Sequence, residues 1–271
     1  MTAENQTGKS SEYQIKTPNQ TDDKSMSNAD FEPLLKLLRV HPALDGLQLD
    51  EQRWHLLDRF CGILSAYNEK VNLVANTTPE VLVNRHILDG LTVASNIYKS
   101  KMTSGKLIDI GSGGGLPAMV IAIACPDLAV TMVDSVGKKV KFLNDASQEL
   151  GLVNNRALTG RAEELAREKG ERASYDLATA RAVGTLTLTL ELCLPFLKRN
   201  GLYMAQKTGS RLEQELKDAK AMMRELECRV EQTKVFTDMP GVEDSVILLI
   251  RKIDDTPHYY PRPWAKIKAS K

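Results

Sequence analysis

A glycine-rich segment and a later aspartate carry the residue types best suited to hold a small ligand. Residues 109–115 read Asp-Ile-Gly-Ser-Gly-Gly-Gly and close a short apolar run that begins at Lys106. Glycines in such a turn permit positive φ and a close approach of the backbone to a ligand. Asp134 ends the next apolar run, where an acid can accept hydrogen bonds from ribose hydroxyls. The spacing predicts a nucleoside-binding site.

The position of the third glycine indicates which nucleoside is bound. In a dinucleotide fingerprint that glycine opens a helix facing a pyrophosphate, but here the position is Leu116. The observed D-x-G-x-G-x-G pattern resembles motif I of the class I methyltransferases, whose cofactor S-adenosylmethionine has no phosphate. Asp109 would help hold the ammonium of its methionine end and would repel a pyrophosphate. The alternative is the glycine-rich loop of a sugar or nucleotide enzyme.

Strands and helices are expected to alternate from Lys106 onward. Apolar runs and helical spacing of apolar residues predict a mostly parallel α/β sheet with helices on both faces. Ligands of such sheets bind at the carboxyl ends of the strands. Two late strands without a helix between them predict an antiparallel hairpin, with a turn at Met239-Pro240-Gly241. The expected strands are 106–110, 129–133, 156–159, 177–180, 202–205, 229–236 and 245–250, and the expected helices are 117–124, 138–150, 162–169, 186–194 and 211–226.

The residues before the first strand contain no glycine fingerprint. Residues 1–30 are polar and nearly free of large apolar side chains, so they predict a disordered tail. Three helices follow, the first stopped by Pro42, the second beginning near Asp50 and the third spanning about 79–98. We therefore expect a tail (1–30), a helical extension (31–104), a Rossmann-like methyltransferase domain (105–254) and a basic, aromatic C-terminal tail (255–271).

Composition excludes several classes of protein. The formal net charge of +1 excludes binding of nucleic acid by a strong global field, although local basic patches remain open. The cysteines lack CxxC pairing, which indicates reduced thiols in the cytoplasm. The four scattered histidines argue against a zinc site, and no apolar stretch approaches the ~20 residues of a membrane span. We expect a monomeric cytoplasmic protein without a metal.

The residues after the fourth predicted strand bear on the atom that is methylated. Methylation of an exocyclic amine usually relies on [DNS]-P-P-[YFW] there, but residues 176–182 read Asp-Leu-Ala-Thr-Ala-Arg-Ala. Methylation of a pyrimidine carbon needs a cysteine nucleophile, and only Cys125 comes near, at the far end of a helix. A nucleophilic ring nitrogen such as guanine N7 needs neither, because the enzyme mainly supplies proximity and orientation.

Several short motifs occur along the chain in a fixed order. They are Arg85-His86-Ile87-Leu88-Asp89, the glycine run with Leu116-Pro117, Val133-Asp134-Ser135 with Lys138-Lys139 and Phe142-Leu143, Arg161-Ala162-Glu163-Glu164, Ala180-Arg181-Ala182, Lys207-Thr208-Gly209 and Tyr260-Pro261-Arg262. This series, over roughly residues 50–262, resembles the bacterial small-subunit rRNA guanine-N7 methyltransferase family, RsmG or glucose-inhibited division protein B. Tyr67-Asn68 departs from the family's frequent Trp-Asn, Ala118 replaces a frequent glycine, and the C-terminal tail also differs.

The resemblance implies transfer of a methyl group from S-adenosylmethionine to N7 of a guanine in the 530 loop of 16S rRNA. The substrate would be the rRNA or the small ribosomal subunit. Arg181 would lie beside the methyl-transfer site as the catalytic residue, and Ala162 and Glu163 would flank the adenine. The expected cofactor-binding residues are Asp109, Gly111, Ser112, Gly113, Gly115, Leu116, Asp134, Ala162, Glu163 and Arg181.

Basic residues near the strand ends are the expected RNA contacts, and each has a plainer alternative. His86 shares a helix face with Asp89 and is either a buried structural residue or part of the substrate pocket. Arg181 could be an ion-pair partner only, and the lysines after Asp134 a solvated face. Residues 258–271 combine basic and aromatic side chains without an acid, which suits RNA or a disordered end. The expected RNA contacts are His86, Lys138, Lys139, Lys207, Arg211 and Arg262.

Two other functions remain open at the level of sequence. A methyltransferase acting on another RNA, a protein or a small molecule would have the same cofactor site. A non-catalytic RNA-binding protein of ribosome assembly would keep the fold without turnover. Binding of RNA that weakens steeply with salt would disfavour a small-molecule or protein substrate, and transfer of label from the cofactor would disfavour the non-catalytic protein.

Overall fold

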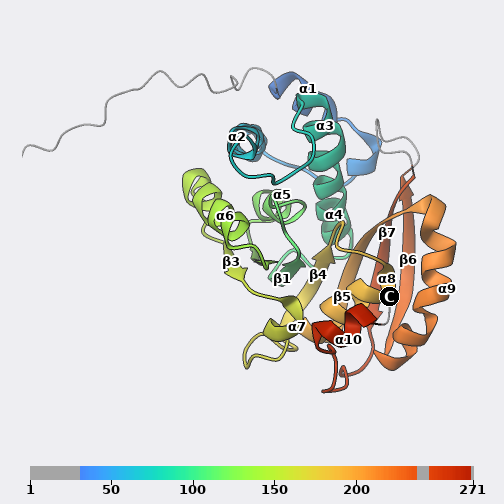
Figure 1. The fold of residues 1–271 in the computed structure, drawn as a ribbon. Helices are drawn as coiled ribbons and strands as arrows, with labels where there is room; N and C mark the ends of the chain where they lie inside the picture. Colours follow the sequence, from blue (N-terminus) through green and yellow to red (C-terminus); the bar gives the residue numbers. More distant parts are fainter. Residues whose placement is uncertain (1–30, 237–243, 270–271) are drawn as a thin grey trace, which may run out of the picture.

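One seven-stranded sheet organises the chain. The computed structural model describes residues 31–236 and 244–269, so the predicted tail 1–30 and the turn at Met239-Pro240-Gly241 lie outside the described residues. The strand order is β3-β2-β1-β4-β5-β7-β6 (Figure 1). All neighbours from β3 to β5 are parallel, whereas β7 is antiparallel to both β5 and β6. The mostly parallel sheet with a late antiparallel hairpin is therefore confirmed. The strands are β1 (Gly105–Ile110), β2 (Leu128–Asp134), β3 (Asn155–Thr159), β4 (Tyr175–Ala180), β5 (Leu197–Thr208), β6 (Cys228–Phe236) and β7 (Ser245–Lys252).

Each face of the sheet has its own apolar core. Successive side chains of a strand point to opposite faces, so Leu107 packs in one cluster and Ile108 in the other. Figure 1 shows α5 and α6 on one side of the sheet and α8, α9 and α10 on the other. Where both faces are covered, as in β2 and β7, the strand appears in the sequence as a nearly continuous apolar run, whereas the edge strands β3 and β6 are more polar and more exposed. The helical segments are α1 (Glu32–Leu38), η2 (Pro42–Leu44), α2 (Glu51–Asn68), α3 (Pro79–Val81), η3 (Leu82–Ile87), α4 (Leu88–Lys99), α5 (Ala118–Ala124), α6 (Gly137–Leu150), α7 (Ala162–Leu165), α8 (Leu186–Cys193), η4 (Leu194–Phe196), α9 (Gly209–Glu225) and α10 (Trp264–Ala269).

The N-terminal helices share the core of the sheet instead of forming a separate one. Asp50 begins α2 by accepting a hydrogen bond from the amide of Arg53 at 2.8 Å. In Figure 1, α4 runs from α3 toward the sheet. A Cβ on Gly90 of α4 would lie 2.7 Å from Cβ of Val120 in α5, so glycine permits this close approach. Buried residues of α2, α4, α5 and α6 consequently belong to one cluster.

Two predicted helices differ from the observed ones. The helix expected over 79–98 contains a π-helical turn, η3, in which the amide of Leu88 donates to the carbonyl oxygen of Val83. An extra residue in one turn leaves no clear mark on apolar periodicity, and such turns occur often at functional sites. The helix expected over 162–169 ends at Leu165, and the chain continues in turns through Gly170, where φ is +100°.

Candidate active site

The glycine-rich segment forms the turn between β1 and α5. Gly111, Gly113 and Gly115 have φ of +74°, +55° and +80°, values that residues with a Cβ adopt only at a cost. A Cβ at Gly115 would lie 2.4 Å from Cγ of Met119. The amide of Gly111 donates to the carbonyl oxygen of Val133 at 2.8 Å, which fixes the turn against β2. The sequence therefore needs glycine here both for conformation and for space.

Asp109 lies beneath this turn, and one of its two carboxylate oxygens has no hydrogen-bond partner among the described residues. Thr179 donates its hydroxyl to Oδ1 of Asp109 at 2.8 Å, and Ser112 donates to the backbone carbonyl oxygen at 3.0 Å. Oδ2 is buried and has no hydrogen-bond partner among the described residues. Burial raises the pKa of Asp109 to about 7. A buried acceptor without a partner calls for an explanation; the contact of Asp109 with the ammonium of S-adenosylmethionine stays a prediction, because the side chain is buried beneath the turn.

The affinity for S-adenosylmethionine is expected to fall as the pH is lowered below the pKa of Asp109. Protonated Asp109 cannot pair with an ammonium, so binding below about pH 7 must release a proton. We expect the dissociation constant to be roughly tenfold higher at pH 5.5 than at pH 7. Calorimetry across this range would measure it, with Asp109→Asn as the comparison, because the variant should bind weakly with a flat pH profile. An equal slope in both proteins would contradict the assignment.

Asp134 connects the glycine turn to the beginning of α6. Its Oδ2 accepts from the amide of Gly113 at 3.0 Å and its Oδ1 from the amide of Val136 at 2.9 Å. Each carboxylate oxygen retains a second lone pair for a ribose hydroxyl. The amide of Gly160 donates to the backbone carbonyl oxygen of Asp134 at 3.1 Å. This bond places the segment after β3 beside the expected ribose position.

Ala162 and Glu163, the expected neighbours of the adenine, begin α7 directly after that segment. Both are buried. Glu163 forms an ion pair with Nε of Arg161 at 2.6 Å, and the guanidinium of Arg161 lies 4.4 Å from the centre of the Trp264 ring. The contact of Glu163 with the adenine stays a prediction. The C-terminal segment supports Glu163 indirectly, because Trp264 packs on its partner Arg161.

Residues 73–76, which the sequence analysis did not assign to the site, line a cavity of about 380 Å³ beside the glycine turn. Asn68 holds this loop: its Oδ1 accepts from the amides of Leu73 and Val74, at 2.8 and 2.9 Å, and its Nδ2 donates to the carbonyl oxygen of Val74 at 3.1 Å. The Tyr67-Asn68 pair in the family resemblance was the available signal. Predicted site residues that line this cavity are His86, Gly111, Ser112, Gly113, Leu116, Lys139 and Arg181.

Arg181 follows β4 and contacts two residues of the helical extension. Its Nη2 lies 2.6 Å from Nδ1 of His86 and 3.3 Å from Oδ2 of Asp89. His86 belongs to the π-helical turn and Asp89 to the first turn of α4. Burial raises the pKa of Asp89, and the charges of Arg181 and Arg85 oppose that shift. The sequence motif around His86 and the one around Arg181 therefore form a single cluster.

His86 is a neutral hydrogen-bond acceptor in this cluster. Burial, with the charges of Arg181 and Arg85, lowers the pKa of His86 to about 4. Because a guanidinium can only donate, Nδ1 of His86 accepts and the ring proton is on Nε2. The histidine thus supports the position of Arg181, and it also lines the cavity at the glycine turn.

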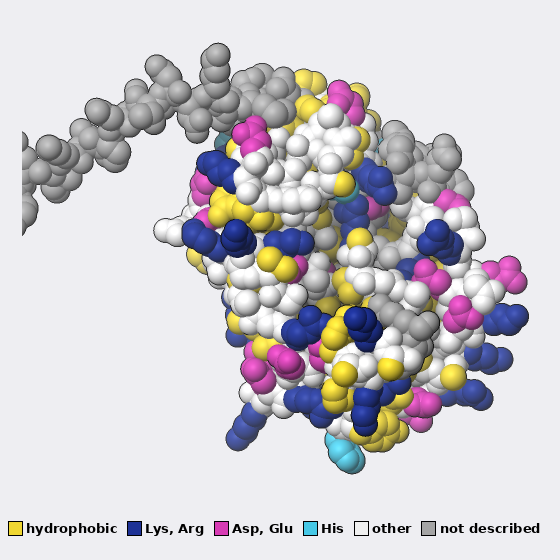
Figure 2. Space-filling view, in the orientation of Figure 1, with side chains coloured by type: hydrophobic (Ala, Val, Ile, Leu, Met, Phe, Trp, Pro, Cys, Tyr) yellow, Lys and Arg dark blue, Asp and Glu magenta, His cyan; other side chains and the backbone are white. Residues whose placement is uncertain are grey.

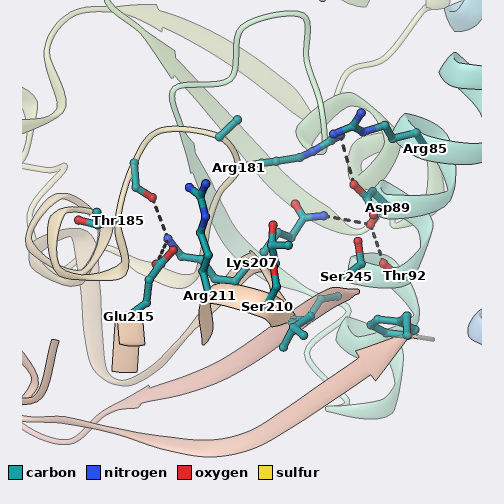
Figure 3. Close-up of a pocket in the computed structure, with 17 residues that line it drawn as sticks. Arg85, Asp89, Thr92, Arg181, Thr185, Lys207, Ser210, Arg211, Glu215 and Ser245 are labelled. Carbon is teal, nitrogen blue, oxygen red and sulfur yellow. Dashed lines mark hydrogen bonds and ion pairs between the residues drawn. The ribbon is translucent and has the colours of Figure 1, made fainter. Parts of the chain in front are cut away.

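A second cavity, of about 700 Å³, lies beside the first and is drawn in Figure 3. Arg85, Arg181 and Ala182 line both cavities, so they form the boundary between them. Figure 3 shows Arg181 and Asp89 on one side of the cavity and Lys207 and Glu215 on the other. Its volume suits a small ligand or a single nucleotide. The ionisable residues that line it are Arg85, Asp89, Arg181, Lys207, Arg211 and Glu215.

The predicted RNA-contacting residues of this region differ in their surroundings. Lys207 lies within β5, pairing with Val246 of β7, and not after the strand. Its buried side chain forms an ion pair with Glu215 at 2.8 Å and donates to the carbonyl oxygen of Gly184 at 2.8 Å. Arg211 extends into the second cavity (Figure 3) and has no ion pair with any described residue. Lys138 is exposed and Lys139 half-buried at the beginning of α6.

The C-terminal segment is folded against the sheet domain up to residue 269. Arg262 forms an ion pair with the buried Glu191 at 2.7 Å, and its amide donates to the same carboxylate at 2.8 Å. Arg172 donates to the carbonyl oxygens of Thr256 and Tyr260 at 2.9 and 2.8 Å. These bonds give Arg262 a structural role, whereas its contact with RNA remains a prediction.

The described residues contain no cluster of His, Cys, Asp and Glu that could hold a metal ion. Within the same residues, no helix has the length and apolar character to cross a membrane. Figure 2 shows Lys and Arg side chains on both sides of the hollow that opens between the helical extension and the sheet domain. The hollow is thus flanked by basic side chains although the net charge of the molecule is only +1.

The sheet order, the glycine turn after β1 and the acid closing β2 define a class I methyltransferase that uses S-adenosylmethionine. The family model described as rRNA small subunit methyltransferase G, GidB, matches residues 53–242. The chain belongs to this family and is a methyltransferase enzyme.

Relatives support the assignment over most of the chain. The ribosomal RNA small subunit methyltransferase G of Alkaliphilus metalliredigens is 37% identical over 218 residues, which cover 80% of this chain and 90% of that protein. The protein of the same name from Bacillus subtilis is 36% identical over 217 residues, with the same coverage. Among solved structures, a candidate O-methyltransferase of Klebsiella pneumoniae shares the fold, with a TM-score of 0.56 at 16% identity over 84% of this chain and 99% of that one.

Proposed function

We propose that this protein transfers the methyl group of S-adenosylmethionine to N7 of a guanine in the 530 loop of 16S rRNA. The observation that carries the proposal is the pair of adjoining cavities that share Arg181, Arg85 and Ala182. One cavity lies at the glycine turn and the other is lined by four basic residues and two acids. A nucleotide turned out of the RNA would enter the basic cavity and present its base at the shared boundary.

The chemistry requires orientation more than proton transfer. The cofactor supplies an electrophilic methyl group. The lone pair of N7 would form the new N–C bond as the S–C bond breaks, and the electrons of the S–C bond would remain on sulfur. No proton leaves N7, so no general base is needed. The neutral His86 bound to Arg181 agrees with this. None of the four cysteines, all of which the structure describes, lines either cavity, and this disfavours a cysteine nucleophile.

The remaining site residues are assigned by position. Asp109, Asp134 and the backbone of the glycine turn would hold the cofactor, and Ala162 with Glu163 would flank its adenine. Arg211 lines the second cavity, Lys139 lines the cavity at the glycine turn and the exposed Lys138 is next to it in the chain, so these three cations would contact phosphates of the RNA. The protein would act as a monomer in the cytoplasm, on rRNA or on the small subunit.

Mapping of N7-methylguanosine in small-subunit rRNA, with and without the gene, tests the proposed function. We expect one site in the 530 loop to lose its methyl group when the gene is absent and to regain it on complementation. Purified protein should transfer tritium from labelled cofactor to small-subunit rRNA or to subunits isolated from the deletion strain. An unaltered map would rule out this substrate, and transfer to a different RNA or a protein would identify the alternative.

A further inference from the structure

The second cavity contains a donor and an acceptor, Arg181 and Asp89, at its boundary with the cavity beside the glycine turn. Nη2 of Arg181 lies 3.3 Å from Oδ2 of Asp89, and both residues are on the same side of the cavity (Figure 3). Only 16% and 10% of the two side chains is exposed, so water screens them weakly. Arg181 also lines the cavity beside the glycine turn, the expected cofactor site, whereas Asp89 lines only the second cavity. The donor is thus nearer the cofactor and the acceptor is farther from it.

The other acid of this cavity is already engaged. Glu215 accepts from Nζ of Lys207 at 2.8 Å and from the amide of Leu186 at 2.7 Å, which ties α9 to the beginning of α8. Among the described residues, Asp89 has an ion pair from its Oδ2 to Arg181 and a side-chain hydrogen bond with Ser245, and its backbone carbonyl oxygen accepts from Thr92 and Gln206. The carboxylate of Asp89 lies beside Arg181 at the boundary of the two cavities, whereas Glu215 lies on the other side of the second cavity (Figure 3), so Asp89 is the acid that a base at this boundary would meet.

The edge of guanine carries acceptors and donors in a fixed order. N7 and O6 are acceptors and lie side by side, and N1–H, separated from O6 by one ring carbon, is a donor. If N7 faces the cofactor, O6 must come next and N1–H farthest away. The protein presents its groups in the same order: first the glycine turn, where the cofactor is expected, then the donor Arg181, and then the acceptor Asp89.

We propose that Arg181 and Asp89 together recognise the guanine: Arg181 donates to O6 while Asp89 accepts from N1–H. This inference rests on the proposed function of the site. Adenine has an amine in place of O6 and a lone pair at N1, so it would place a donor against the guanidinium and an acceptor against the carboxylate. The pair thereby selects guanine and fixes which nitrogen faces the methyl group.

Base analogues at the mapped target nucleotide test this proposal. Inosine keeps N7, O6 and N1–H, whereas 2-aminopurine keeps N7 but lacks O6 and has an N1 lone pair. In the wild-type protein at saturating cofactor, we expect inosine to react within about tenfold of guanine and 2-aminopurine at least roughly 100-fold more slowly. Equal losses for the two analogues would overturn the proposal without requiring any variant.

The Asp89→Asn variant separates recognition from support of Arg181. Its amide can donate to the N1 lone pair of 2-aminopurine, so the ratio of the 2-aminopurine rate to the guanine rate should rise at least about tenfold. Glu215→Gln is the matched control, since it removes the same charge from the other acid of the cavity and should leave this ratio unchanged. Binding of the cofactor by calorimetry confirms that each variant is folded.

If Asp89 only held Arg181 in place, the Asp89→Asn variant would transfer methyl more slowly to guanine and to 2-aminopurine by the same factor. The ratio of the two rates would then be unchanged, and this result would overturn the proposal. Failure of the proposed function is distinguishable, because wild-type protein would then not methylate guanine at this position at all. All rates are measured on the full chain, with rRNA or reconstituted subunits that carry the analogue.

Discussion

Replacing Arg181 with alanine is expected to lower the rate of methyl transfer by roughly 10²- to 10³-fold, the cost of losing one preorganised donor in an active site. The guanidinium contacts His86 and Asp89 and lines both cavities. Its loss would remove the group that orients the base and would leave the carboxylate of Asp89 buried without its cation. Single-turnover transfer at saturating cofactor measures the effect.

The dissociation constant of the cofactor should change far less than the transfer rate in this variant, because the glycine turn and Asp134 remain intact. Arg156→Ala is a matched control: Arg156 lies in β3 and pairs with Glu171 at 2.8 Å, outside both cavities. It should transfer methyl at the wild-type rate. A transfer rate of Arg181→Ala equal to that of this control would disprove the catalytic role.

Replacing Asp134 with alanine is expected to raise the dissociation constant of S-adenosylmethionine by roughly 10- to 100-fold, the equivalent of one or two charge-assisted hydrogen bonds. The carboxylate would bind the ribose and already accepts from Gly113 and Val136. The variant therefore loses a ligand contact and also two bonds that hold the glycine turn. Calorimetry at pH 7 measures the change.

Asp127→Ala provides the control for this experiment. Asp127 is exposed and precedes β2, so it lies at the opposite end of the strand from Asp134. Its replacement should leave cofactor binding unchanged. If Asp134→Ala bound the cofactor as tightly as Asp127→Ala does, the ribose contact would be wrong. The isosteric Asp134→Asn tests the charge alone and should show an intermediate loss.

The strands and the cofactor loop were predictable because their signals are local. The apolar run before Asp109 and the one that ends at Asp134 each fall on a strand, and glycines at 111, 113 and 115 all have the positive φ that their spacing implied. A parallel sheet buried on both faces makes such runs conspicuous. The late hairpin also followed from the missing helix between its strands.

Contacts between distant segments were not predictable from one sequence. Nothing local indicates that Arg181 meets Asp89 or that Thr179 binds Asp109, and the Tyr67-Asn68 pair did not show that Asn68 fixes the loop beside the glycine turn. The π-helical turn was not predicted, because one inserted residue hardly alters the helical spacing of apolar residues. The charge of Arg262 suggested contact with RNA, but its buried partner Glu191 is visible only in three dimensions.

The contacts of the C-terminal segment support the wall of the site from residues that belong to no strand. Trp264 covers Arg161, the partner of Glu163, and residues 256–260 receive Arg172 from more than 80 positions earlier in the chain. β1 to β7 all precede residue 256, so the strands and these contacts come from separate parts of the chain. A chain that ended after β7 would contain every strand of the sheet yet lack the support of the wall next to Glu163.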